Sequence, residues 1–177
     1  MLVDLRKGEH KAPEFLKLNP GGKVPVLMDG DLVLSESAAI CTHVGERFPA
    51  SGLVPPLTDP SNRASYFQWC FFAMSELEAP LWAMTKHTRL MPEERRVAAI
   101  APTCIWEFEK AAKILAQHME GREYAVGSQF TAADILLGGT LNWGKSLEIA
   151  LPTPSLEAYA ERMAAHPALL KAKERGM

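Results

Sequence analysis

The sequence lacks the features that mark several large classes of protein. It has no apolar run of about 18 residues, so it predicts no membrane-spanning helix. Its first ten residues, MLVDLRKGEH, lack the apolar stretch of a secretory signal peptide. It has no basic tract or stripe, and its formal net charge is -2. We therefore expect neither a membrane nor a nucleic acid as a partner.

Cysteine is also scarce, with 3 in 177 residues. Cys41, Cys70 and Cys104 are odd in number and far apart, which predicts neither a disulfide framework nor a metal site and favours a reducing cytoplasm. Cys41 lies four residues after Ser37, within one predicted helix. It can be interpreted as a nucleophile or as a small buried apolar residue, and the second interpretation is the more common one for such a position.

In the first part of the chain, the sequence predicts a β-hairpin. Two short apolar runs, at residues 24–28 and 32–34, flank the turn sequence Asp29-Gly30-Asp31, which predicts two antiparallel strands. Pro25 cannot donate to a strand ladder, so the first strand must start, bend or lie at an edge there, and a cis Val24–Pro25 bond is compatible with this position.

A helix is predicted directly after the hairpin, from about residue 36 to residue 48, with Ser35 as its N-cap. The start of a helix carries unpaired N–H groups and attracts anions. Glu36 and Ser37 would add a carboxylate and a hydroxyl there, which together suit an amino-acid head group. Lys23 could take a second carboxylate, and the backbone of Val24 could pair with a peptide bond. The alternative is that Glu36 and Ser37 only cap the helix and that Lys23 is a solvated surface charge.

The remaining sequence predicts a division of the chain. Residues 49–60 contain four prolines, so we expect a first domain at residues 1–49, a linker at 50–60 and a second domain at 61–177. Apolar residues recur at helical spacing through the second domain, which predicts an all-helical bundle. Kinks or interruptions are expected at Pro80 and Pro102, and a short strand is expected at residues 2–5.

A second local signal is FTAADI, at residues 130–135. Thr131 can cap a helix while Asp134 reaches back to the N–H of the cap residue, so the pair predicts a capping box with a role in folding. Gly138 and Gly139 follow in the same helix and predict close packing against a neighbour.

Two of these stretches, NPGGKVPVL at residues 19–27 and ESAAI at residues 36–40, together resemble the glutathione-binding segment of the glutathione transferase family. FTAADI resembles the capping motif of the same family's helical domain. The resemblance covers nearly the whole chain. It implies an α/β thioredoxin-like N-terminal domain, here incomplete, followed by an all-α helical bundle.

The resemblance also implies a set of glutathione-binding residues. The valine of the motif pairs its backbone with the cysteinyl part of glutathione, and the proline after it is cis. The Glu-Ser pair holds the γ-glutamyl head, and the lysine together with an upstream histidine reaches the glycine carboxylate. In this sequence the corresponding residues are His10, Lys23, Val24, Pro25, Glu36 and Ser37.

Against the family pattern, the chain starts at what corresponds to the second strand. The first strand and helix of the family carry the tyrosine, serine or cysteine that activates the glutathione sulfur, so no catalytic residue is assigned. We expect a shortened gene product or a start codon placed too late.

The function implied by the resemblance is conjugation of the glutathione thiolate to a small electrophile, by a homodimer. Met74, Trp82 and Met84 are candidates for the electrophile pocket, although core packing is the better interpretation for each of them. The alternative function is a non-catalytic binding or dimerisation module.

Overall fold

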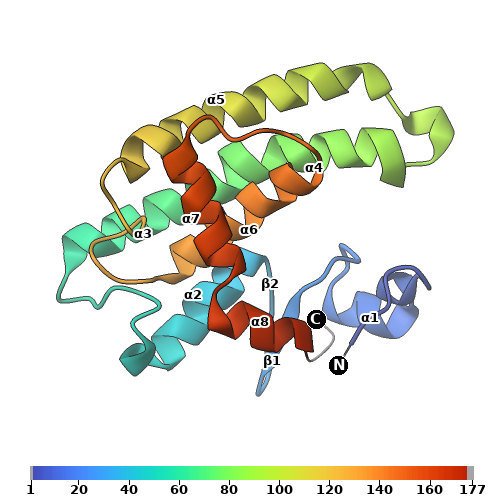
Figure 1. The fold of residues 1–177 in the computed structure, drawn as a ribbon. Helices are drawn as coiled ribbons and strands as arrows, with labels where there is room; N and C mark the ends of the chain where they lie inside the picture. The colour runs from blue at the N-terminus through green and yellow to red at the C-terminus, as the bar shows by residue number, and fades with distance from the viewer. Residues whose placement is uncertain (1, 175–177) are drawn as a thin grey trace.

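A computed structural model describes residues 2–174 (Figure 1). The first part of the chain contains η1 (Glu9–Lys11), α1 (Pro13–Leu18), β1 (Val26–Asp29), β2 (Leu32–Ser35) and α2 (Ser37–Arg47). The second part is helical and contains η2 (Pro49–Ser51), α3 (Pro60–Phe72), η3 (Ala73–Glu78), α4 (Ala79–Thr85), η4 (Lys86–Leu90), η5 (Glu93–Arg95), η6 (Ala98–Ile100), α5 (Ala101–Met119), α6 (Ala132–Ser146), α7 (Pro154–Ala164) and α8 (Pro167–Glu174). Among residues 2–174, no helix combines the length and the apolarity needed to cross a membrane.

The hairpin forms as the sequence predicts. Strands β1 and β2 pair antiparallel, from Val26 opposite Ser35 to Asp29 opposite Leu32, and Gly30 takes the positive φ of 60° that the turn requires. Helix α2 is tied back to the strand end, because the Asp29 carboxylate accepts a hydrogen bond of 2.9 Å from His43 Nε2 and lies 3.4 Å from Arg47 Nε.

Two predictions for this part of the chain are wrong. Residues 2–5 form no strand; the Asp4 carboxylate accepts the backbone N–H of Arg6 at 2.9 Å and so folds the segment into a turn. Ser35 does not cap α2, because it belongs to β2 and pairs with Val26. The N-cap position is occupied by Glu36.

One long helical rod runs from α3 through the π-helix η3 and α4 into the π-helix η4. The residues at the three junctions all keep right-handed helical dihedrals. The interruption predicted at Pro80 takes the form of η3, since the wider π turn ends just before this proline, whose missing N–H cannot continue the α ladder. Pro102 causes no kink. Two 3-10 turns occupy the preceding residues, so α5 begins at Ala101 and Pro102 lies in its first turn. The N–H groups of a first turn have no partner within the helix, so the missing N–H of proline costs nothing there.

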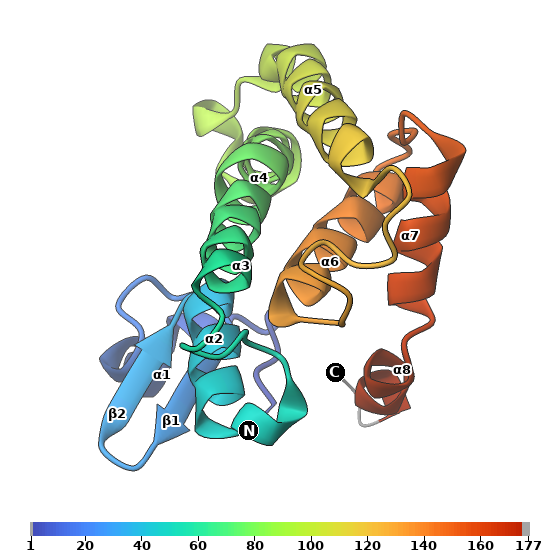
Figure 2. The same cartoon turned by 90° about the vertical axis from the view of Figure 1, so that its left-hand side faces the viewer.

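Helix α6 is the centre of the second part and packs against α2, α3, η3 and α7 (Figure 2). Close approach depends on two glycines: a Cβ on Gly138 would lie 2.6 Å from Met163 Cγ of α7, and a Cβ on Gly144 would meet the Phe108 ring of α5. Gly139, in contrast, faces open space. The core cluster is otherwise apolar and includes the fully buried Leu77, Leu81, Leu115, Leu137 and Leu141.

The start of α6 forms a capping box around a buried carboxylate. Asp134 is 0% exposed and accepts the backbone N–H of Thr131 at 2.8 Å and that of Ala125 at 2.8 Å. The Tyr159 hydroxyl of α7 donates to the same carboxylate at 2.9 Å, and the Thr131 hydroxyl does so at 3.1 Å. This carboxylate therefore joins α6, α7 and the loop before α6.

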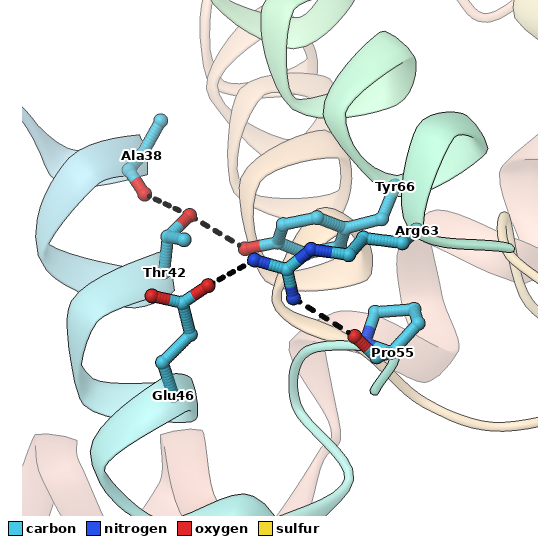
Figure 3. A network of polar contacts seen from close by, with 6 residues as sticks. All are labelled: Ala38, Thr42, Glu46, Pro55, Arg63 and Tyr66. Carbon is cyan, nitrogen blue, oxygen red and sulfur yellow. Dashed lines mark hydrogen bonds and ion pairs between the residues drawn. The ribbon is translucent and has the colours of Figure 1, made fainter. Parts of the chain in front are cut away.

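The two parts of the chain are joined by a polar network between α2 and α3 (Figure 3). The Thr42 hydroxyl donates to the carbonyl of Ala38 at 2.8 Å, so the Tyr66 hydroxyl, 2.8 Å away, is the donor in its bond to Thr42. Arg63 pairs with Glu46 and also donates to the carbonyl of Pro55 at 3.0 Å.

The proline-rich segment between α2 and α3 is packed into this junction. Val54 is buried, and a Cβ on Gly45 of α2 would lie 2.6 Å from Val54 Cγ2. The carbonyl of Leu53 accepts the N–H of Ala132, at the start of α6, at 2.8 Å. The segment thus contacts both parts of the chain.

Candidate functional site

A cleft of about 450 Å³ lies between the hairpin part and the long helical rod. Its lining contains all six binding residues that the sequence predicted: His10, Lys23, Val24, Pro25, Glu36 and Ser37. The helical part supplies the opposite wall with Glu78 of η3, Trp82 of α4, Leu90 of η4 and Trp143 of α6. Residues that are far apart in the sequence therefore meet in one cavity.

The loop before β1 is held in shape by Asn19. Its side-chain oxygen accepts the N–H of Gly21 at 2.9 Å, and its amide nitrogen donates to the carbonyl of Lys23 at 2.8 Å. Gly22 has a φ of 59°, and a Cβ there would lie 3.2 Å from the carbonyl oxygen of His10. The Val24–Pro25 bond is cis. Sequence reasoning overlooked Asn19, although the turn sequence Asn-Pro-Gly-Gly was a signal for it.

The start of α2 lines the cleft with Glu36 and Ser37. Glu36 has a φ of 71° and a ψ of 117°, which is unusual for a residue with a side chain and is a form of strain found at binding sites. Ser37 is the first residue of the helix and is half-buried. The unpaired N–H groups of this first turn, together with the helix dipole, favour an anionic group beside Ser37.

Charged groups surround the cleft. Lys23 Nζ lies 5.5 Å from the centre of the Trp82 ring, and Lys86 Nζ lies 5.9 Å from the same centre. Burial raises the pKa of Glu78; the charge of Glu36 raises it further, and that of Lys23 lowers it. His10 Nδ1 is buried and has no hydrogen-bond partner within residues 2–174. An unpaired buried donor or acceptor in a cleft is suited to receive a polar group of a ligand.

The helical wall is aromatic, with the rings of Trp82 and Trp143 6.4 Å apart at an angle of 59°. Of the three candidates for an electrophile pocket, only Trp82 lines the cleft. Met84 follows it by two positions, about 200° around the helix, and is buried in the core. Met74 also packs against the core. Glu78 and Trp143 were not identified from the sequence.

Cys41 takes no part in the cleft lining. It packs against the core, and burial raises the pKa of its thiol, which disfavours the reactive thiolate. In the part of the chain that the structure describes, no three His, Cys, Asp or Glu side chains gather as a metal site would require.

Both parts of the chain match models of one protein family. The model of the glutathione S-transferase N-terminal domain matches residues 1–46, and that of the C-terminal domain matches residues 79–167. The chain belongs to the glutathione S-transferase family. Both the family and the fold class predicted from the sequence are thereby confirmed.

Particular relatives support this assignment. Glutathione S-transferase 1 of Dianthus caryophyllus is 34% identical over 137 residues, which cover 76% of this chain and 60% of the relative. A glutathione S-transferase from Xylella fastidiosa superimposes with a TM-score of 0.82 at 29% identity, covering 98% of this chain and 84% of that one. For the fold alone, a glutathione transferase homologue from Sulfitobacter, with bound glutathione, superimposes with a TM-score of 0.85 at 24% identity, covering 99% of this chain and 84% of that one. The chain thus spans 60% of the length of the Dianthus caryophyllus relative.

Proposed function

We propose that this chain binds glutathione in the cleft between the hairpin part and the helical rod. The observation that carries the proposal is the convergence of Lys23, Val24, Glu36 and Ser37 on one cavity. The first turn of α2 and the Ser37 hydroxyl suit the carboxylate of an amino-acid head, and Glu36 suits its ammonium group. Val24 lines the cleft just before the cis bond to Pro25, where its backbone suits the peptide, and Lys23 with His10 suits the terminal carboxylate.

We further propose that the bound glutathione reacts as a thiolate with a small electrophile lying against Trp82 and Trp143. The thiol loses its proton to water, the sulfur forms a bond to the electrophilic carbon, and the leaving group departs with its bonding electrons. The protein would contribute binding and orientation, because holding both reactants in one cleft turns a bimolecular encounter into an effectively unimolecular step. The aromatic wall offers apolar contact for the electrophile.

A homodimer in the cytoplasm is part of the same proposal. Phe71 on α3 is 67% exposed and stacks on Phe67 at 6.5 Å, so this helix presents an aromatic face that a second copy could cover. The three cysteines are free thiols, which fits a reducing compartment. Light scattering on the purified chain measures the dimer directly.

The test of the binding proposal is calorimetric titration with glutathione of the wild type, Ser37→Ala and the control Ser128→Ala. Ser128 is exposed and lies outside the cleft lining. We expect saturable binding that Ser37→Ala weakens about 10-fold, since a hydrogen bond to a charged group is lost, and that Ser128→Ala leaves unchanged. A folded wild type that binds no glutathione would contradict the proposal.

The transfer step needs its own measurement. With saturating glutathione and a nitro-activated aryl halide, we expect halide release and thioether formation above the uncatalysed rate. Binding of glutathione without any such acceleration, over a panel of electrophiles, would favour the non-catalytic binding module.

A further inference from the structure

A second carboxylate lies in the cleft, and neither the family motif nor the proposed binding residues account for it. Glu78 is the last residue of η3 and lines the cleft together with Glu36 from the opposite part of the chain. Within residues 2–174, neither side chain has a hydrogen bond or an ion pair. Glu78 is half-buried, whereas Glu36 is exposed to solvent. A partly buried carboxylate beside a second carboxylate is disfavoured unless a cation joins the two.

We propose that Glu78 is a binding residue and that Glu36 and Glu78 hold the ammonium group of the ligand between them. The inference rests on the proposed binding of glutathione. It adds a contact from the helical part of the chain to the amino-acid head, so that the ligand bridges both walls of the cleft.

The helical rod directs Glu78 toward the cleft. Its neighbour Leu77 is fully buried in the core, so the Glu78 side chain leaves the rod on a different face. Trp82 follows four residues later, on the same face as Glu78, and also lines the cleft. Glu78 is therefore part of the cavity wall and is not a residue of the outer surface.

The electrostatic surroundings favour a cation at this place. Burial raises the pKa of Glu78, and the negative charge of Glu36 raises it further, because two carboxylates repel each other. Lys23 relieves this in part, but its ammonium lies over the Trp82 ring, 5.5 Å from the ring centre. A ligand ammonium between the two carboxylates would remove the repulsion and satisfy both. The carboxylate of the same head group would then lie at the first turn of α2, where Ser37 is the first residue.

The experiment compares two ligands on three proteins. Glutathione and its des-amino analogue, glutaryl-cysteinyl-glycine, differ only in the ammonium group. Both are titrated by calorimetry into the wild type, Glu78→Gln and the control Glu76→Gln. Glu76 is an exposed acid two residues earlier and lies outside this cleft. Glutamine keeps the size of the side chain and removes only its charge.

We expect Glu78→Gln to weaken the binding of glutathione about 10-fold and to leave the binding of the analogue unchanged, because only glutathione offers an ammonium to this carboxylate. Glu76→Gln should bind both ligands as the wild type does. Equal weakening of both ligands by Glu78→Gln, or no weakening of either, would overturn the assignment while leaving glutathione binding intact. A wild type that binds neither ligand would overturn the proposed function itself and this inference with it.

Discussion

Replacing Asp134 by alanine should strongly destabilise the fold without touching the cleft. The carboxylate is fully buried and accepts hydrogen bonds from the backbone N–H groups of Thr131 and Ala125 and from the hydroxyl of Tyr159. Alanine removes the acceptor and leaves these three buried donors, together with the Thr131 hydroxyl, without this partner. Burial raises the pKa of Tyr159 and the adjacent Asp134 raises it further, so the phenol stays protonated and keeps its donor role.

The magnitude follows from the number of donors. Each orphaned buried donor costs about 1–3 kcal/mol, and the loss is partly offset because a buried charge no longer has to be desolvated. We expect a net loss of about 4 kcal/mol in the free energy of unfolding, a large fraction of the about 5–15 kcal/mol of a typical domain. For a chain of this length that corresponds to a fall in Tm of about 8–16 °C.

The assay is thermal and urea unfolding followed by circular dichroism. Two milder variants calibrate it: Asp134→Asn, which keeps one acceptor oxygen and should cost about 2 kcal/mol, and Tyr159→Phe, which removes a single donor and should cost about 1 kcal/mol. The reasoning would be refuted by an alanine variant that melts within about 2 °C of the wild type, or by Tyr159→Phe being more damaging than Asp134→Ala.

Two further predictions concern packing and pH. Gly138→Ala should destabilise the fold by about 1–3 kcal/mol, because the new methyl group meets Met163. Gly139→Ala faces open space and should be neutral or stabilising by up to about 1 kcal/mol. Equal urea midpoints for the two variants would contradict this. The hydrogen bond from His43 and the charge of Arg47 lower the pKa of Asp29 from its ordinary value of 3.8. The stability that the ionised Asp29 contributes is therefore fully present above pH 3.8 and is lost as the pH falls through the lower pKa of the folded state. Asp29→Asn should therefore be less stable than the wild type near neutral pH and equal to it in acid, and a gap that persists in acid would argue against the linkage.

The parts of the fold that sequence reasoning predicted depend on local chemistry. Asp29-Gly30-Asp31 between two apolar runs can hardly form anything but a tight turn, and the pairing of Thr131 with Asp134 is contained within four residues. Five of the six cleft residues also lie in two short motifs, so their convergence was predictable once the motifs were recognised. His10 lies outside both motifs and became a candidate only through the family resemblance. Helix boundaries were less certain, since Pro102 fits the first turn of a helix as well as a kink.

The parts that were not predicted depend on the tertiary structure. Residues 2–5 have the composition of a strand, yet a strand needs a partner, and no described strand pairs with them. Glu78 and Trp143 reach the cleft only because the rod and α6 lie where they do. Asn19 was overlooked for a different reason: its role is to hold the loop, which residue type alone does not distinguish from an ordinary turn.

The buried segment around Val54 determines how the two parts of the chain respond to stress. A proline-rich connection on the surface would act as a hinge and let each part open by itself. Here Leu53 is hydrogen-bonded to the start of α6, Val54 fills the space beside Gly45, and Arg63 joins Pro55 to Glu46. Opening the hairpin part would therefore expose the start of α6 and its buried carboxylate as well. Ligand contacts in the cleft and the packing of the bundle consequently share one cooperative unit, so a ligand that tightens the cleft should also slow local opening far along the helices.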